Sequence, residues 1–217
     1  MRAGKKEYIM PQNTHDQFHY KRSEAVGQVW ERRKFMFELI QNLDASALLW
    51  IQDVVRQEFL NPLVCLYTKL GDSGILWIVL SAVMLCFRPT RKAGFAALVA
   101  MLFGLVLNNM IIKELVGRPR PWLDVEGLRY VIFEGDPNSF PSGHTCSSFA
   151  AASAWWRLAP KKWIRVTGLV MAVCMGLSRL YIGVHYPTDV ITGAVIGMLC
   201  GWLAWMVCTR AIWKKSE

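Results

Sequence analysis

Histidine is scarce in this chain, and its cysteines form none of the spacings that are typical of metal or redox sites. Four histidines occur among 217 residues, and two of them lie in the polar N-terminal segment. The six cysteines lie singly within or beside apolar segments, with no CxxC or Cys/His pattern. We therefore expect packing roles for the cysteines, no disulfide framework, no metal site and no cofactor.

The alternating and amphipathic patterns of a soluble core are also missing, because the apolar residues come in long runs. The chain is 53% hydrophobic and contains ten tryptophans. Residues 190–209 carry no charge, and as a helix they would rise about 30 Å, the thickness of the hydrocarbon layer. Similar or shorter runs occupy residues 73–87, 93–112, 142–156 and 166–184. The sequence predicts an all-α polytopic transmembrane bundle with five spans. The alternative, a soluble protein with several buried helices, is disfavoured because these uncharged runs leave too little polar surface.

The N-terminal part of the sequence is less regular than the rest. Residues 1–34 are polar and basic and lack the apolar core of a signal peptide. We expect them to form a tail that precedes a membrane domain over residues 35–217. Residues 35–68 are apolar but are interrupted by Asp44, Asp53, Arg56 and Glu58. They are interpreted either as an amphipathic helix at the outer interface or as a sixth span.

Basic residues mark alternate connections between the expected spans. They are Arg88, Arg91 and Lys92, then Arg157, Lys161, Lys162 and Arg165, and finally Arg210, Lys214 and Lys215. By the positive-inside rule these connections and the C-terminus are cytoplasmic, in a multi-pass protein of the cell membrane. The net charge of +9 then follows from topology and needs no nucleic-acid partner. The remaining polar motifs fall on the extracytoplasmic side.

One of these motifs pairs a histidine with a carboxylate. His185 and Asp189 are four residues apart where a helix is expected to begin, and Pro187 suits its first turn. This spacing places both side chains on one helix face. The carboxylate can then hold one ring nitrogen while the other attacks an electrophile. Capping of the helix by His185 is the plainer alternative.

A second histidine closes the sequence Pro141-Ser142-Gly143-His144 on the same side of the membrane. Ser142 and the amides after it can form an anion cradle at a helix N-terminus, although Ser142 alone would read as an N-cap. Gly143 permits close approach of the backbone. A nucleophilic His185 needs a general acid for the leaving oxygen, and His144 supplies one.

Fixed cations complete the set of candidate site residues. Lys113, Arg120 and Arg179 can meet the negative charge that spreads over the oxygens of a phosphoryl group in its transition state. Arg179 lies within an apolar segment, where an ionisable residue is functional by default. We expect Arg118 to be an auxiliary contact for phosphate or headgroup. The chemistry that this inventory favours is phosphoryl transfer at a membrane surface.

The pattern Lys-x6-Arg-Pro, Pro-Ser-Gly-His, Ser-Arg-x5-His-x3-Asp resembles the type 2 phosphatidic acid phosphatase (PAP2) superfamily. All eleven specified positions are present, from Lys113 and Arg120-Pro121 through Pro141–His144 to Ser178-Arg179, His185 and Asp189. The resemblance implies a phosphohistidine at His185, oriented by Asp189, with His144 protonating the leaving group and later activating water. It implies phosphate binding by Lys113, Arg120, Ser142, Gly143, Ser178 and Arg179, supported locally by Pro121 and Pro141.

Several functions share these residues. We favour a bacterial-type lipid phosphate phosphatase acting on undecaprenyl diphosphate, with phosphatidylglycerophosphate and phosphatidic acid as alternative substrates. A lipid phosphotransferase would use the same site and would differ in its dependence on an acceptor lipid. A non-catalytic membrane protein would not need all eleven positions. The sequence sets no oligomeric state, and it assigns Gly193, Gly197 and Gly201 to close helix packing.

Overall fold

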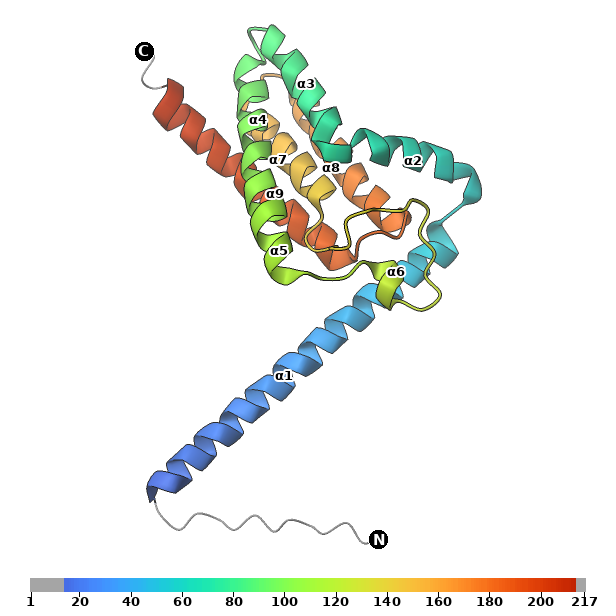
Figure 1. Cartoon of the computed structure of the whole chain (residues 1–217). Coiled ribbons are helices and arrows are strands. Elements are labelled where there is room, and N and C mark those ends of the chain that lie inside the picture. The colour runs from blue at the N-terminus through green and yellow to red at the C-terminus, as the bar shows by residue number, and fades with distance from the viewer. Residues whose placement is uncertain (1–13, 214–217) are drawn as a thin grey trace. The chain divides into compact units, whose positions relative to one another are not determined.

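The computed structural model describes residues 14–213, and the described chain is helical without β-strands (Figure 1). The α-helices are α1 (Thr14–Trp50), α2 (Asn61–Leu70), α3 (Ile75–Cys86), α4 (Arg91–Gly104), α5 (Lys113–Val116), α6 (Pro121–Asp124), α7 (Gly143–Leu158), α8 (Lys162–Tyr181) and α9 (Pro187–Val207). Short π-helical or 3₁₀ segments are η1 (Ile51–Val55), η2 (Glu58–Leu60), η3 (Asp72–Gly74), η4 (Leu105–Ile112) and η5 (Cys208–Trp213). The expected all-α class is confirmed.

Helix α7 lies at the centre of the bundle and packs against α4, α8 and α9, while α3 packs against α4 (Figure 1). Small side chains line these contacts: the alanines of α4 and α7 are among the most buried residues of the core. They let the helix backbones approach closely, as membrane helices require when lipid offers no hydrophobic driving force between them.

The predicted glycine face of α9 is confirmed by the packing of α9 on α7. A Cβ built at Gly197 would lie 2.3 Å from the carbonyl oxygen of Cys146, and one at Gly201 would lie 2.5 Å from Cβ of Ser153. At Gly193 the contact is the Ser142 carbonyl oxygen, 2.6 Å away. The last contact seats the start of α7 directly on α9, so helix packing also fixes two of the sequence motifs against each other.

Three helices are long and apolar enough to cross a membrane. They are Arg91–Val116, Lys162–Tyr181 and Pro187–Arg210, and Glu58–Leu70 with Asp72–Cys86 form a bent pair that passes the same test together. Large apolar side chains such as Leu102, Leu177 and Ile191 are more than half exposed on these helices, which suits contact with lipid. The protein is therefore a multi-pass membrane protein. Helices α3 and α7 have 12 and 16 residues and are shorter than a full span.

The N-terminal segment is helical where the structure describes it. Helix α1 runs from Thr14 through the expected boundary at residue 34 to Trp50, because no proline or paired glycine interrupts this stretch. Residues 1–13 lie outside the described range. The chain divides into two compact units between Leu43 and Asp44, so the last turns of α1 belong to the same unit as the bundle.

Candidate active site

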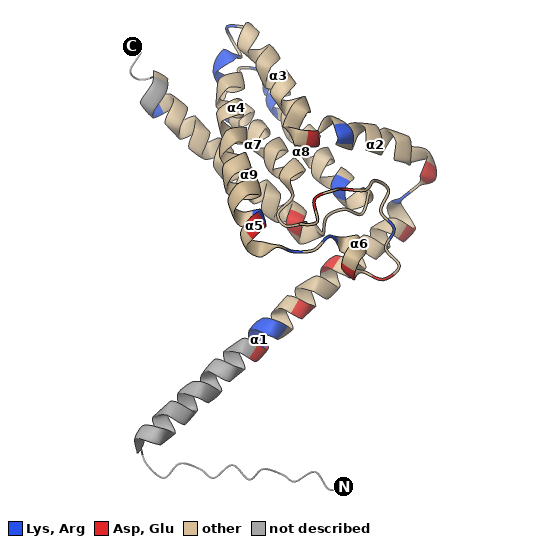
Figure 2. Cartoon of the chain, viewed as in Figure 1, with Lys and Arg blue, Asp and Glu red and all other residues tan. Residues whose placement is uncertain are grey.

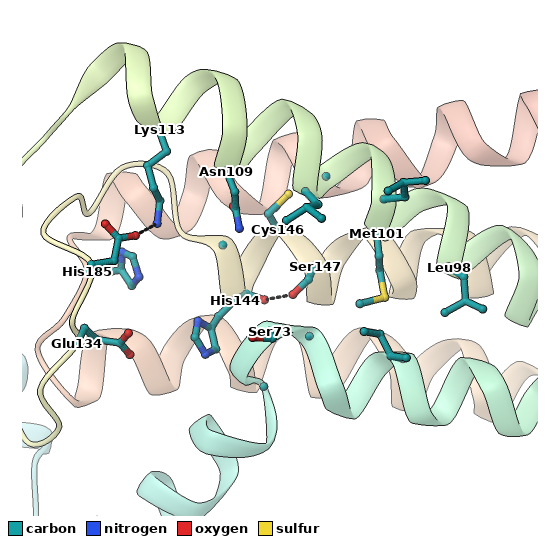
Figure 3. A pocket seen from close by; sticks show the side chains of 18 of the residues that line it. Ser73, Leu98, Met101, Asn109, Lys113, Glu134, His144, Cys146, Ser147 and His185 are labelled. Atoms are coloured by element: carbon teal, nitrogen blue, oxygen red, sulfur yellow. Dashed lines mark hydrogen bonds and ion pairs between the residues drawn. The ribbon is translucent and has the colours of Figure 1, made fainter.

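The three sequence motifs meet at one end of the bundle because neighbouring helices run in opposite directions. The run of helix that begins with α4 ends beyond Lys113, α7 begins beside His144, and His185 precedes α9. A cavity of about 570 Å³ opens here, and its lining includes Lys113, Arg120, Gly143, His144 and His185 (Figure 3). The structure thus brings five of the predicted site residues onto one cavity.

His185 is almost completely buried, with 1% of its surface exposed. Its Nε2 lies 3.0 Å from Nη1 of Arg120. Because a guanidinium only donates hydrogen bonds, Nε2 must accept and therefore carries the lone pair. The proton then sits on Nδ1, which lies 3.6 Å from Oδ2 of Asp189. The contact with Arg120 selects the tautomer whose Nε2 can act as a nucleophile.

The protonation state of His185 agrees with this tautomer. Burial of the ring, followed by the positive charges of Arg120, Arg179 and Lys113, holds the pKa of His185 well below its usual range. A lowered pKa in a cationic group means that the neutral form persists down to lower pH. The imidazole is therefore neutral at physiological pH, and its Nε2 carries no proton and accepts the hydrogen bond from Arg120.

Asp189 is held by the start of α9. Its Oδ2 accepts a hydrogen bond of 2.9 Å from the backbone N–H of Tyr186, and Pro187 occupies the first turn as expected. Such a carboxylate satisfies a helix N–H that has no partner within the helix. The position of the carboxylate opposite His185 is therefore set by the helix terminus itself.

Arg118 contacts two carboxylates, and its expected contact with phosphate or headgroup stays a prediction. It does not line the cavity. Its Nη1 lies 2.7 Å from Oδ1 of Asp189, its Nη2 lies 2.7 Å from Oδ2 of Asp44, and its guanidinium stacks on the Tyr186 ring at 3.8 Å. Gly117, with φ of +58°, ends α5 and reverses the chain just before Arg118. The turn delivers Arg118 to the start of α9, where it contacts the carboxylates.

Ser142 and Gly143 shape the entry into α7. The Oγ of Ser142 accepts hydrogen bonds from Oγ1 of Thr145 at 2.9 Å and from its backbone N–H at 3.4 Å, as an N-cap does. A Cβ at Gly143 would lie 3.0 Å from Oδ1 of Asn109, so glycine permits this close approach. The carbonyl of Pro141 accepts a 3.4 Å hydrogen bond from Asn108. Asn108 and Asn109 are not among the site residues predicted from the sequence. Two adjacent amides within an apolar run do, however, indicate a specific polar contact.

Three carboxylates contact the cations and the second histidine. Asp136 Oδ2 lies 2.6 Å from Lys113 Nζ, Glu134 binds Arg179, and Asp72 Oδ1 lies 2.9 Å from His144 Nε2. Partial burial tends to raise the pKa of Asp136, but the hydrogen bond from Lys113 and that from a backbone N–H outweigh it and lower that pKa. The groups that would bind an anion are thus paired with internal anions.

Ser178 and Arg179 are not among the residues that line the cavity. Arg179 is 1% exposed, and its Nη1 donates a 2.6 Å hydrogen bond to Oγ1 of Thr68. The hydroxyl of Ser178 donates to the carbonyl of Met175 within α8, at 2.7 Å. Pro121 occupies the first turn of the short α6. Arg179 contacts Glu134, which lines the cavity, and its charge helps to lower the pKa of His185. Ser178 is engaged with its own helix.

Comparison with known proteins identifies the family. The PAP2 superfamily model matches residues 93–213, more than half of the chain. An undecaprenyl-diphosphatase of Sulfolobus acidocaldarius is 30% identical over 73% of this chain and 75% of its own length. A lipid A 4'-phosphatase of Bacteroides thetaiotaomicron is 27% identical over 81% of each chain.

A solved structure supports the same assignment. The crystal structure of a transmembrane PAP2-type phosphatidylglycerolphosphate phosphatase from Bacillus subtilis superposes with a TM-score of 0.65 at 28% identity, covering 80% of this chain and 88% of that one. The match with the family model, the membrane-spanning helices and the three motifs around one cavity agree. This chain belongs to the PAP2 superfamily of membrane lipid phosphatases.

Proposed function

We propose that the protein hydrolyses undecaprenyl diphosphate to undecaprenyl phosphate through a phosphohistidine at His185, on the extracytoplasmic face of the membrane. The observation that carries this proposal is the position of His185 Nε2. This nitrogen lies 3.0 Å from Nη1 of Arg120, and both residues line a cavity together with Lys113 and His144. We assign His185 as the nucleophile, His144 as the proton donor, and Lys113 with Arg120 as the cations that act on one phosphoryl group.

The chemistry follows from these positions. Nε2 of His185 attacks the terminal phosphorus, a P–N bond forms, and the P–O bond to the lipid phosphate breaks. His144 gives its proton to the departing oxygen. Lys113 and Arg120 stabilise the charge on the equatorial oxygens as they exchange carboxylate partners for the phosphoryl group. Water, deprotonated by His144, then attacks phosphorus, releases inorganic phosphate and restores Nε2.

The walls of the cavity fit an amphiphilic substrate. Ionic residues line the end at His185, whereas the remainder includes Ile78, Leu98, Met101, Leu102 and Leu105 from α3, α4 and η4 (Figure 3). Leu102 and Leu105 are at least half exposed on the outer surface. A lipid chain can lie along this apolar part while its phosphate reaches the histidines.

The choice of lipid rests on the outward orientation of the site and on the similarity to an undecaprenyl-diphosphatase. We expect kcat/KM for undecaprenyl diphosphate to exceed that for phosphatidylglycerophosphate and phosphatidic acid at least tenfold, a difference of about 1.4 kcal/mol in transition-state binding. The measurement compares the lipids, with a lipid A phosphate included, in one detergent by phosphate release and product analysis. A tenfold preference for any other lipid would replace the proposed substrate.

The proposed orientation depends on the distribution of basic residues. Helices α3, α4, α7, α8 and α9 run alternately between the end that holds the cavity and the opposite end, and we propose that all five cross the membrane. Charged residues of both signs lie at the cavity end, whereas those at the opposite end, where α3 meets α4 and α7 meets α8, are Lys and Arg (Figure 2). That end and the C-terminus are then cytoplasmic.

Thiol labelling tests this orientation. In a background without native cysteines, a cysteine replacing the exposed Glu126, on the cavity side, is expected to react with an impermeant maleimide on intact cells. A cysteine replacing the exposed Lys161, between α7 and α8, is the matched control and is expected to react only after permeabilisation. The reverse labelling pattern would place the site in the cytoplasm.

Response to chelators tests the use of side-chain cations. Within residues 14–213, no group of three or more His, Cys, Asp or Glu side chains is placed to hold a metal ion, and the cations that line the cavity are Lys113 and Arg120. We expect full activity after EDTA treatment and inhibition by vanadate, whose trigonal geometry mimics the transition state. Loss of activity in EDTA that an added divalent ion restores would contradict the mechanism.

A further inference from the structure

Asp44 is a buried carboxylate near the end of α1, 3% exposed and well upstream of the segment that the PAP2 model matches. Its Oδ2 pairs with Nη2 of Arg118 at 2.7 Å, and its Oδ1 accepts a 3.1 Å hydrogen bond from the backbone N–H of Thr188. The Thr188 hydroxyl also binds Oδ2. The side chain thus joins α1 to the first turn of α9.

The same guanidinium connects Asp44 with the carboxylate beside His185. Nη1 of Arg118 donates to Oδ1 of Asp189 and to Oγ1 of Thr188, both at 2.7 Å. One guanidinium therefore serves two buried carboxylates, Asp44 and Asp189, which are 3% and 0% exposed. Asp189 in turn faces Nδ1 of His185.

The charge balance of this cluster has a direct effect on Asp189. With both carboxylates ionised, two carboxylates and one guanidinium give the cluster one net negative charge next to His185. If Asp44 were neutral, the positive charge of Arg118 would be balanced by Asp189 alone. Asp189 would then stabilise a positive charge on the His185 imidazole less well. A phosphorylated His185 carries that positive charge, and in a buried site such interactions are weakly screened.

We propose that Asp44 is a positioning residue for phosphoryl transfer, acting through Arg118 and Thr188 to hold Asp189 and to preserve its negative charge opposite His185. This inference rests on the proposed role of His185 as the nucleophile. Because Asp44 does not line the cavity, its loss affects formation of the phosphoenzyme and leaves binding of the lipid unchanged.

The test separates kcat from KM in the full-length protein with undecaprenyl diphosphate as the probe. Asp44→Asn keeps the shape of the side chain and removes its charge, and we expect kcat to fall at least tenfold while KM stays within twofold. Asp44→Glu is expected to recover part of kcat. Asp53→Asn, an exposed carboxylate nearby in the chain, is the matched control and is expected to keep wild-type values. An unchanged kcat, or a change confined to KM, would overturn the inference.

A double-mutant comparison tests the route through Arg118. If Asp44 acts by way of the guanidinium, Asp44→Asn added to Arg118→Gln lowers kcat less than twofold further. Full multiplication of the two effects would overturn this route. If Asp44→Asn does not fold, Thr188→Val removes the hydroxyl link between the same groups, and a threefold fall in kcat at constant KM is expected. Wild-type kcat in that variant would also overturn the inference.

The outcome for His185→Ala keeps this inference distinct from the proposed function. An inactive His185→Ala beside a fully active Asp44→Asn would contradict only the role of Asp44. An active His185→Ala would contradict the nucleophile itself.

Discussion

Replacement of His185 by alanine is expected to lower the turnover of lipid phosphate by at least about a thousandfold, because it removes the group that accepts the phosphoryl unit. Nε2 of His185 is the ring nitrogen that accepts from Nη1 of Arg120, 3.0 Å away, and His185 lines the cavity. The measurement is phosphate release from undecaprenyl diphosphate, combined with trapping of acid-labile phosphate on the protein in a rapid acid-free quench.

A matched histidine replacement controls for the loss of an imidazole. His19 lies outside the three motifs, and the His19→Ala variant is expected to keep both turnover of the lipid and phosphate labelling. His144→Ala is expected to form the phosphoenzyme slowly, because the proton donor is lost while the nucleophile remains. Robust hydrolysis by purified His185→Ala protein would refute the phosphohistidine mechanism.

Arg120→Lys is expected to lower kcat about a hundredfold although the positive charge is kept. The guanidinium donates to the carbonyls of Val184 and Asp136 at 2.9 Å each and contacts Nε2 of His185 at 3.0 Å. A lysine ammonium lacks this planar set of donors, so it cannot fix the loop and the imidazole together. Loss of one donor that stabilises developing negative charge costs about 10²–10³ in rate in other enzymes.

The control for Arg120→Lys is Arg129→Lys, which changes an exposed arginine in the same loop region and is expected to behave as wild type. Thermal unfolding in detergent checks that both variants are folded. A kcat for Arg120→Lys within threefold of wild type would show that charge alone accounts for the contribution of Arg120.

The sequence was sufficient to predict the helical class and the gathering of the motifs. Residues 190–209 lack charge, and His185 and Asp189 are four residues apart, so a span and a histidine–carboxylate contact both follow from local periodicity. The glycine face of α9 was predictable for the same reason. The span, the histidine–carboxylate contact and the glycine face depend on residues close together in the sequence, whereas the gathering of the motifs follows from the alternating direction of successive helices.

Features that depend on distant contacts could not be predicted. From the sequence, Arg118 is one more cation close to Arg120. Its ion pairs with Asp44 and Asp189 depend on the turn at Gly117, which is seen only in the folded chain. Likewise, Glu134 reads as part of an acidic, aromatic loop, and its contact with Arg179 joins residues 45 positions apart. Local periodicity cannot predict such pairs, because the partners come together only when the whole chain has folded.

The close contact between α7 and α9 sets limits on substitution that the chemistry alone would not suggest. Gly193 and Gly197 carry no reactive group, yet an added methyl would meet the backbone oxygens of Ser142 and Cys146, which have no rotamer by which to retreat. Relief would require the two helices to separate, and the N-terminal ends of those helices hold His144 and Asp189. The distance between the backbones of α7 and α9 therefore fixes the position of His144 relative to Asp189. Substitutions inside the bundle are tolerated only where they leave that distance unchanged.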